Sequence, residues 1–183
     1  MNLSKASFSL ETKRLSLRVL DSFAVTEAYV SWLNNPEINK YLEARWTVHS
    51  FDSVSSQVDS IYESSNDALF GICTRPQSAM HIGNVKLSAI DPMHRTAEIG
   101  FLIGEKDYWG QGLASEAIGR VCDWAFSDLG LRKITAGAYA VNLGSIKALE
   151  KVGFQREGVL KDQVQLTPNT RCDVYRFGLI VSD

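Results

Sequence analysis

The spacing of apolar residues changes along the chain, from a helical front through a run of strands to an alternating end. Leu15–Leu20 alternates as a strand does, and helical spacing follows over Asp21–Trp32 and again over Val54–Glu63. The segment between these two helices, Pro36–His49, is rich in aromatic and charged residues and has no regular period. The front of the chain therefore predicts one strand and two helices.

The middle of the chain predicts three short strands, Leu69–Cys73, His81–Ile90 and Glu98–Ile103. The turn-forming cluster Thr74–Ala79 and the pair Asp91–Pro92 separate them. Strands with connections this short are typical of an antiparallel meander.

Helices and strands alternate toward the C-terminus. The pattern predicts a helix over Leu113–Leu129 that ends at Gly130, a strand over Lys133–Ala140, a helix over Leu143–Val152, and strands near Phe154–Val164 and Asp173–Val181. The whole order predicts a single domain over residues 1–183, of α+β (mixed α/β) class, built around one mixed sheet.

The composition fits one globular domain and removes several classes of function. Of the 183 residues 45% are hydrophobic, and 19 Lys and Arg nearly balance 21 Asp and Glu, so the net charge of -2 offers no footprint for nucleic acid. No run of about 18 apolar residues predicts a membrane span, and the N-terminal residues lack the apolar segment of a signal peptide. We therefore expect a cytoplasmic protein with neither a membrane nor a nucleic-acid partner.

The three cysteines, Cys73, Cys122 and Cys172, are dispersed and form no C-x-x-C pair. This spacing favours reduced, buried thiols over a disulfide framework or a zinc site. The three histidines also lack metal-ligand spacing, so no metal is expected.

The stretch Asp107–Ala117 reads D-Y-W-G-Q-G-L-A-S-E-A and places two glycines just before a predicted helix. Backbone N–H groups that no side chain covers, together with a helix N-terminus, suit a phosphate. The glycines alone are equally consistent with a tight turn. A P-loop is excluded because no Gly-Lys-Ser/Thr follows, and a dinucleotide fingerprint fails at Ser115, where a third glycine is needed.

Three stretches must be considered together: T-K-R-L-S-L-R near the N-terminus, W-G-Q-G-L-A-S-E-A, and N-L-G-S-I-K-A-L-E-K-V-G-F-Q-R-E-G downstream. Jointly they resemble the GNAT superfamily of acetyl-CoA-dependent N-acetyltransferases, and their spacing is similar to that of its RimJ/RimL-like branch, which includes enzymes that acetylate ribosomal-protein N-termini. The resemblance covers about Glu11 to Val181. It implies a twisted, mostly antiparallel sheet of about six or seven strands flanked by about four helices.

The resemblance implies acetyl-CoA as co-substrate, with its pyrophosphate held on the backbone amides of a Q/R-x-x-G-x-G/A loop. Gly112 and Ala114 match the last two fixed positions, whereas Trp109 stands where relatives carry Gln or Arg. The amides of Gln111–Ser115 are thus the expected cradle. The full set of expected cofactor contacts is Phe101, Leu102, Ile103, Trp109, Gly110, Gln111, Gly112, Leu113, Ala114, Ser115, Asn142, Ser145 and Lys151.

The downstream motif implies two more roles. Asn142 falls where family members bond the pantetheine arm, which its amide group suits, although Asn is also a common helix N-cap. The tyrosine that many relatives use as general acid is replaced by Leu149. Ser145 falls where RimL-like members carry a serine that can bond the departing thiolate, and a plain helix-start serine is the alternative.

Acetyl transfer needs a neutral amine, so a proton acceptor is expected. Family members often carry a Glu at the position of Glu98, and an exposed strand-edge carboxylate is the alternative. His94 is a second candidate in the substrate site because an imidazole titrates near neutral pH. The expected oxyanion donor is a backbone N–H near Phe101–Leu102.

The first helices and their loop wall the acceptor site in this family, so Trp32, Tyr41 and Arg45 are expected substrate contacts, with packing as the alternative. The acceptor is expected to be a peptide or small-molecule amine: a protein N-terminus of the ribosomal-protein-alanine type, or a small amine such as a nucleotide-linked amino sugar. A non-catalytic acyl-CoA-binding module is the competing class. A monomer or homodimer is expected.

Overall fold

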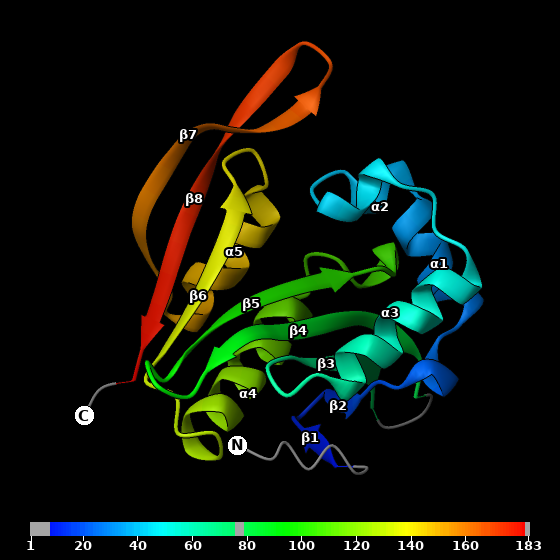
Figure 1. Ribbon diagram of the computed structural model, residues 1–183, viewed down its shortest axis with the longest axis vertical. Coiled ribbons are helices and arrows are strands. Elements are labelled where there is room, and N and C mark those ends of the chain that lie inside the picture. The colour runs from blue at the N-terminus through cyan, green and yellow to red at the C-terminus, as the bar shows by residue number, and fades with distance from the viewer. Residues whose placement is uncertain (1–7, 76–78, 182–183) are drawn as a thin grey trace.

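A computed structural model describes residues 8–75 and 79–181, so residues 76–78 of the predicted turn Thr74–Ala79 lie outside the described part. One sheet with helices on both faces makes up the fold (Figure 1). Its strands are β1 (Ser9–Glu11), β2 (Leu15–Val19), β3 (Ala68–Thr74), β4 (His81–Asp91), β5 (Thr96–Ile103), β6 (Lys133–Tyr139), β7 (Gln155–Thr167) and β8 (Thr170–Ile180). The helices are α1 (Glu27–Asn34), α2 (Pro36–Asn39), α3 (Phe51–Glu63), α4 (Leu113–Ser127) and α5 (Leu143–Val152), with 3-10 turns η1 (Ser22–Ala24), η2 (Glu43–Trp46) and η3 (Lys106–Tyr108).

The sheet has eight strands in the order β1-β2-β3-β4-β5-β6-β8-β7. Every neighbouring pair is antiparallel except β5 and β6, which run parallel. The predicted α+β class, the mixed sheet and the β3-β4-β5 meander are confirmed. The count exceeds the expected six or seven strands because β1 spans only three residues, too few to produce an alternation.

Local capping signals decide where the helices begin and end. Helix α5 has the predicted bounds because Asn142 caps its start and Gly153, at φ 107°, ends it in the left-handed region. The first helix was predicted to start at Asp21, but the Asp21 side chain caps only η1, and Thr26 caps α1. The aperiodic segment Pro36–His49 folds into α2 and η2.

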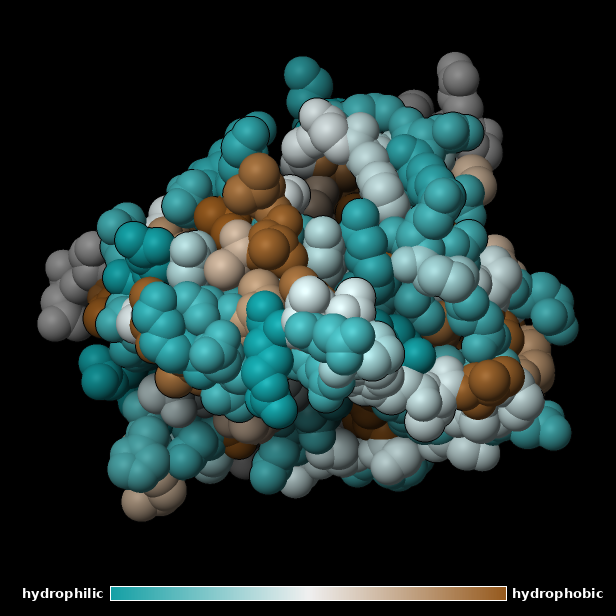
Figure 2. Space-filling view, turned by 90° about the horizontal axis from the view of Figure 1, so that it is seen from above, coloured by the Kyte–Doolittle hydropathy of each residue, from teal (hydrophilic) through white to brown (hydrophobic). Residues whose placement is uncertain are grey.

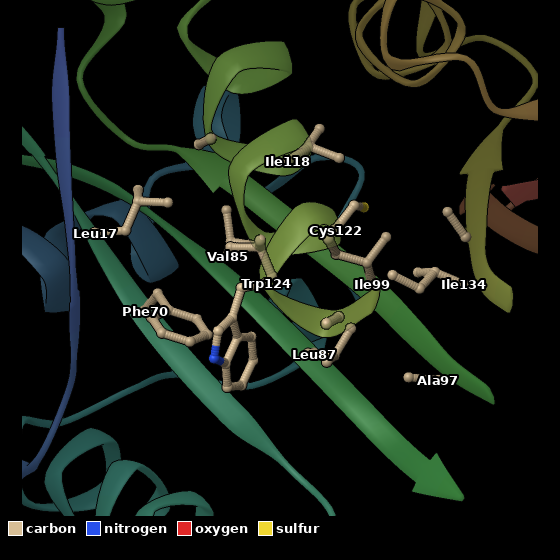
Figure 3. Packing of buried hydrophobic residues seen from close by; sticks show 14 of the residues in the cluster. Leu17, Phe70, Val85, Leu87, Ala97, Ile99, Ile118, Cys122, Trp124 and Ile134 are labelled. Carbon is tan, nitrogen blue, oxygen red and sulfur yellow. The ribbon is translucent and has the colours of Figure 1, made fainter. Parts of the chain in front are cut away.

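The main core lies between the sheet and helices α4 and α5 (Figure 1). On the other face α3 packs over β3, and α1 and α2 lie beside it. Phe70 of β3 meets Trp124 of α4 with ring centroids 5.3 Å apart, and Leu17, Val85 and Ile118 belong to the same cluster (Figure 3). Each such side chain contributes about 1.5–3 kcal/mol on burial. This packing fixes α4, and therefore its N-terminus, against the sheet.

All three cysteines are buried and free, as predicted. Burial, reinforced by the Asp123 carboxylate, raises the pKa of the Cys122 thiol to about 12, so it stays protonated at neutral pH. Over residues 8–75 and 79–181, the helices are all too short or too polar to cross a membrane.

Strands β5 and β6 pair over only part of their length. Their parallel register runs from Thr96 beside Lys133 to Glu98 beside Thr135, and then stops. Both strands continue, β5 to Ile103 and β6 to Tyr139, so they diverge in the middle of the sheet (Figure 1). The starts of α4 and α5 both lie at this opening.

Candidate active site

A cavity of about 730 Å³ lies where β5 and β6 diverge. This volume is within the range of about 300–1,000 Å³ that small-molecule sites occupy. Figure 2, seen from above, shows a hollow with hydrophobic surface inside it and hydrophilic surface around it. The walls are the end of β5, the loop into α4, the start of α5, and the segment around α2.

Every residue expected to contact the cofactor lines this cavity: Phe101, Leu102, Ile103, Trp109, Gly110, Gln111, Gly112, Leu113, Ala114, Ser115, Asn142, Ser145 and Lys151. These residues come from the end of β5, the glycine loop and two helices, and the fold brings them together. Of the expected substrate contacts, only Tyr41 lines the cavity.

The glycine loop ends in a helix N-terminus that carries no side-chain cap. Gly110 and Gly112 have φ angles of 73° and 75°, in the left-handed region where residues with a Cβ are strained. Gly112 is the N-cap of α4 and offers no side-chain acceptor, so the first-turn amides at the cavity remain available. Free amides and the positive end of the helix dipole together favour an anion here.

Trp109 holds this loop in place. Its indole Nε1 donates to the backbone oxygen of Ile103 at 2.8 Å, and the Gln111 side chain donates to the Asp107 oxygen at 2.6 Å. The side chain at position 109 thus ties the loop to the end of β5. The Trp109 indole therefore has a structural role in the loop.

Cationic groups surround the loop. A Cβ placed on Gly112 would lie 3.0 Å from Lys151 Nζ and 3.9 Å from Arg14 Nη2. Arg14 donates to the Gln111 oxygen at 3.0 Å and pairs with Glu116 at 2.6 Å. Burial raises the pKa of the Glu116 carboxyl, but hydrogen bonds from Thr12 and Arg14 outweigh it and leave the pKa below its usual range. Glu116 therefore stays ionised and fixes Arg14 under the loop.

At the start of α5, Asn142 is an N-cap, since its Oδ1 accepts from the Ser145 N–H at 3.2 Å. The cap holds Ser145 at the edge of the cavity. Val141 and Leu143, 47% and 62% exposed, give this mouth an apolar rim. Leu149, at the family's tyrosine position, is fully buried in the main core.

Arg45 does not line the cavity but connects its two sides. Its Nη1 donates to the Tyr139 hydroxyl at 2.9 Å and to the Leu42 oxygen at 2.7 Å, and its Nη2 donates to the Gln165 oxygen at 2.6 Å. The Tyr139 hydroxyl in turn donates to Glu43. Burial, followed by the bond to Glu43, raises the pKa of Tyr139. The segment around η2 is thereby tied to β6 and to the β7–β8 hairpin.

Glu98 lies outside the cavity lining and is paired with a cation. Its Oε1 accepts from Arg176 Nη1 at 2.8 Å. The two side chains remain 42% and 35% exposed, respectively. Glu98 lies on the same strand face as Leu102, four residues away, which is about 13 Å along the strand.

Two predicted substrate contacts are not at the site. Trp32 is 2% exposed, donates to Glu105 at 3.0 Å and packs against Gly104, so it belongs to the core beneath the end of β5. His94 is exposed in the turn before β5, where its backbone N–H bonds Asp91. The length of β5 places that turn about 20 Å from the cavity end of the strand.

Sequence reasoning missed Arg14, Tyr139 and Arg176. Arg14 meets Gln111 across 97 residues, and Arg176 meets Glu98 across 78. Such partners leave no local spacing in a single sequence, because strand order alone brings them together. The alternation of β6, which puts Tyr139 on the face of Thr135 and Gly137, was the only available signal.

Comparisons with known proteins agree with this geometry. Residues 14–155 match the family model described as Acetyltransferase (GNAT) domain. The uncharacterized N-acetyltransferase p20 of Bacillus licheniformis is 32% identical over 177 residues, covering 94% of this chain and 96% of that protein.

Solved structures show the same fold. The spermidine N-acetyltransferase of Vibrio cholerae, in complex with CoA and spermine, superposes with a TM-score of 0.81 at 26% identity, covering 92% of this chain and 96% of that chain. RimL, a ribosomal L7/L12 alpha-N-protein acetyltransferase in complex with coenzyme A, has a TM-score of 0.81 at 18% identity, covering 95% of this chain and 98% of that chain. The chain therefore belongs to the RimJ/RimL-like group of the GNAT family and is an acetyl-CoA-dependent N-acetyltransferase.

Proposed function

We propose that the enzyme transfers acetyl directly from acetyl-CoA to a small primary amine in a ternary complex. The observation that carries this proposal is the single cavity that joins the uncapped start of α4 to the diverging ends of β5 and β6. The amides of Gln111–Ser115 bind the pyrophosphate, and Lys151 adds charge beside them. A second hollow of about 650 Å³, which shares Gly112 and Lys151, gives the nucleotide end of the cofactor room outside the loop.

The pantetheine arm lies between β5 and the start of α5, where Asn142 offers an amide. The acetyl oxygen accepts from a backbone N–H near Phe101–Leu102, on the side of β5 that β6 no longer covers. The amine nitrogen attacks the thioester carbon, the carbon–sulfur bond breaks, and the product is an amide with free CoA. Ser145 donates a hydrogen bond to the departing thiolate.

Glu98 accepts the amine proton through water. The distance of about 13 Å along β5 between Glu98 and Leu102 exceeds hydrogen-bond reach, so a direct transfer is disfavoured. Arg176 keeps the Glu98 carboxylate in one orientation at 2.8 Å. A relay of one or more waters along β5 then connects it with the amine.

The charge of the cavity argues against a polycationic acceptor, although the Vibrio relative was solved with spermine. Among the described residues that line the cavity, Glu37 is the only acidic one, and it is paired with Lys106. Lys40, Lys147 and Lys151 also line the cavity. A small amine whose remaining groups are neutral or negatively charged fits the charge of the lining better than a polyamine does. A protein N-terminus is the second candidate, favoured by the apolar rim of Val141 and Leu143, which can receive the first side chains of a peptide.

Thiol release from acetyl-CoA, measured against peptides, polyamines, amino acids, antibiotics and nucleotide-linked amino sugars, tests the proposal. We expect turnover with a small amine and little with spermidine. If amines leave the slow hydrolysis of acetyl-CoA unchanged while the cofactor still binds, the chain is a binding module and the proposed transfer is wrong.

Glu98→Gln is expected to lower kcat/KM for the amine by about 10²–10⁴-fold, the usual contribution of general base catalysis, with unchanged affinity for acetyl-CoA. Glu157→Gln is the matched control because Glu157 is also a partly exposed carboxylate paired with a cation, Lys133, at 2.7 Å. An unchanged rate and pH profile in Glu98→Gln would remove the base assignment.

A further inference from the structure

Three neighbouring strands place Glu98, Gly137 and Arg176 in a line. Glu98 of β5 is next to Thr135 of β6, and Gly137 of β6 is next to Arg176 of β8. The Arg176 side chain reaches across β6 to Glu98, and a Cβ on Gly137 would lie 3.1 Å from Arg176 Nη1. Glycine at position 137 therefore makes room for the guanidinium to cross the strand.

The face of β5 between the cavity and this ion pair carries no side chain of its own. Leu102 lines the cavity, and Gly100, two residues earlier in β5, lies on the same face of the strand. Gly100 is exposed, and a Cβ there would meet nothing within 4 Å. Glu98 is the next residue on that face, so no β5 side chain stands between Leu102 and Glu98.

Arg176 has hydrogen-bonding capacity to spare. Within the described chain, only Nη1 bonds a protein acceptor, and Glu98 uses only Oε1. Two other ion pairs lie on this face, Lys133–Glu157 at 2.7 Å and Lys86–Asp67 at 3.2 Å, and in each the cation is paired with its own carboxylate. The guanidinium fork of an Arg binds a carboxylate or phosphate through two parallel N–H groups.

We propose that Arg176 recognises an oxyanion that the acceptor carries close to its amine, while Glu98 faces the amine through water. The inference rests on the proposed function and narrows it: the acceptor is an amine with a carboxylate or a phosphate group, such as an amino acid or an aminoalkyl phosphate. Nε and Nη2 bind the oxyanion, and Nη1 stays on Glu98. Arg176 is thus a specificity-determining residue.

Matched pairs of acceptors test this assignment, with acetyl-CoA saturating and kcat/KM as readout. Alanine against alaninamide tests a carboxylate, and O-phosphoethanolamine against ethanolamine tests a phosphate. We expect the wild-type enzyme to prefer the anionic member of at least one pair by about tenfold or more, and the pair with the larger ratio identifies the oxyanion.

Two variants locate the effect. Arg176→Gln should lower kcat/KM for both members of a pair, because Glu98 loses its ion-pair partner. It should lower kcat/KM for the anionic acceptor about 10- to 100-fold further, so that the preference is lost. Gly137→Ala keeps the charge but displaces the guanidinium, and should reduce the same preference. Arg156→Gln is the control, because Arg156 lies over the Tyr175 ring and should leave the preference unchanged.

Equal preference for both members of each pair in the wild-type enzyme, or equal loss for both in Arg176→Gln, would overturn the inference. Binding distinguishes this failure from failure of the proposed function. If no acceptor turns over, calorimetric titration of the same amines into the CoA-saturated protein replaces kcat/KM. Tighter binding of the anionic amine to wild type than to Arg176→Gln then supports the inference, and equal binding refutes it.

Discussion

At the scale of single residues, the geometry of the cofactor loop depends on two glycines. Gly110 and Gly112 adopt φ angles of 73° and 75°, which most residues reach only with strain. Motif reasoning found them because the loop is continuous in sequence and its chemistry is local. The pairing of Glu98 with Arg176 could not be found in this way, because it depends on the order of β5, β6 and β8.

Gly112→Val should weaken acetyl-CoA binding by about tenfold or more, because the added side chain strains the loop and meets Lys151 where the pyrophosphate is expected. Calorimetry of acetyl-CoA binding measures the change. Gly158→Ala is the control: Gly158 lies in β7 outside both hollows and its Cβ would meet nothing within 4 Å, so the variant should retain affinity and gain about 0.5–1 kcal/mol of stability. Unchanged affinity in Gly112→Val contradicts the pyrophosphate site.

At the scale of elements, local signals gave most of the structure. Helix α5 was predicted with its correct bounds because Asn142 and Gly153 are both in the sequence next to it. The start of α1 was misplaced because Asp21 and Thr26 are both good caps and only packing decides between them. The segment Pro36–His49 shows no regular spacing of apolar residues. Contacts of Arg45 with Tyr139 and Gln165, which are distant in sequence, hold this segment instead.

Trp109→Phe is expected to loosen the loop without unfolding the domain. It removes the 2.8 Å hydrogen bond to the Ile103 oxygen, worth about 0.5–1.5 kcal/mol, so the Kd for acetyl-CoA should rise about two- to tenfold. Trp46→Phe is the control, since Trp46 is 56% exposed and lies outside the cavity lining. Equal affinities in all three proteins would show that the indole does not position the loop.

At the scale of the whole molecule, the sheet has two parts, β1–β5 and β6–β8. In the described part of the sheet, they are joined only by the short parallel pairing of β5 with β6. The sequence pattern predicted seven of the eight strands and one mixed sheet, because α4 and α5 alternate with strands along the C-terminal part of the chain. Where the two strands separate could not be read from sequence, because β5 and β6 both continue as ordinary strands beyond the last paired residues.

His81 links global stability to pH. Burial lowers the pKa of its imidazole, against the opposing effects of hydrogen bonds with Asn84 and Gly83 and of the nearby Glu105 charge. The folded pKa lies below the unfolded value of about 6.5, so the unfolded chain takes up the proton first as the pH falls. The contribution of neutral His81 to the free energy of unfolding is therefore present above about pH 6.5 and is lost below it. Tm should fall between about pH 7.5 and pH 5.5, and the fall should be smaller in His81→Gln. His94→Gln, which changes an exposed histidine, serves as control, and an unchanged slope in His81→Gln contradicts the linkage.

The divergence of β5 from β6 creates an edge in the interior of the sheet. Central strands normally hold the slowest amide protons of a domain, because opening them requires global unfolding. Within residues 8–75 and 79–181, the amides of β5 beyond Glu98 that face β6 have no strand partner, so they should exchange with deuterium much faster than the paired amides of β4. Bound acetyl-CoA should accept hydrogen bonds from these amides and so slow their exchange. Hydrogen–deuterium exchange with and without the cofactor measures the difference. Exchange at Gly100–Ile103 that the cofactor leaves unaltered would place the pantetheine arm elsewhere.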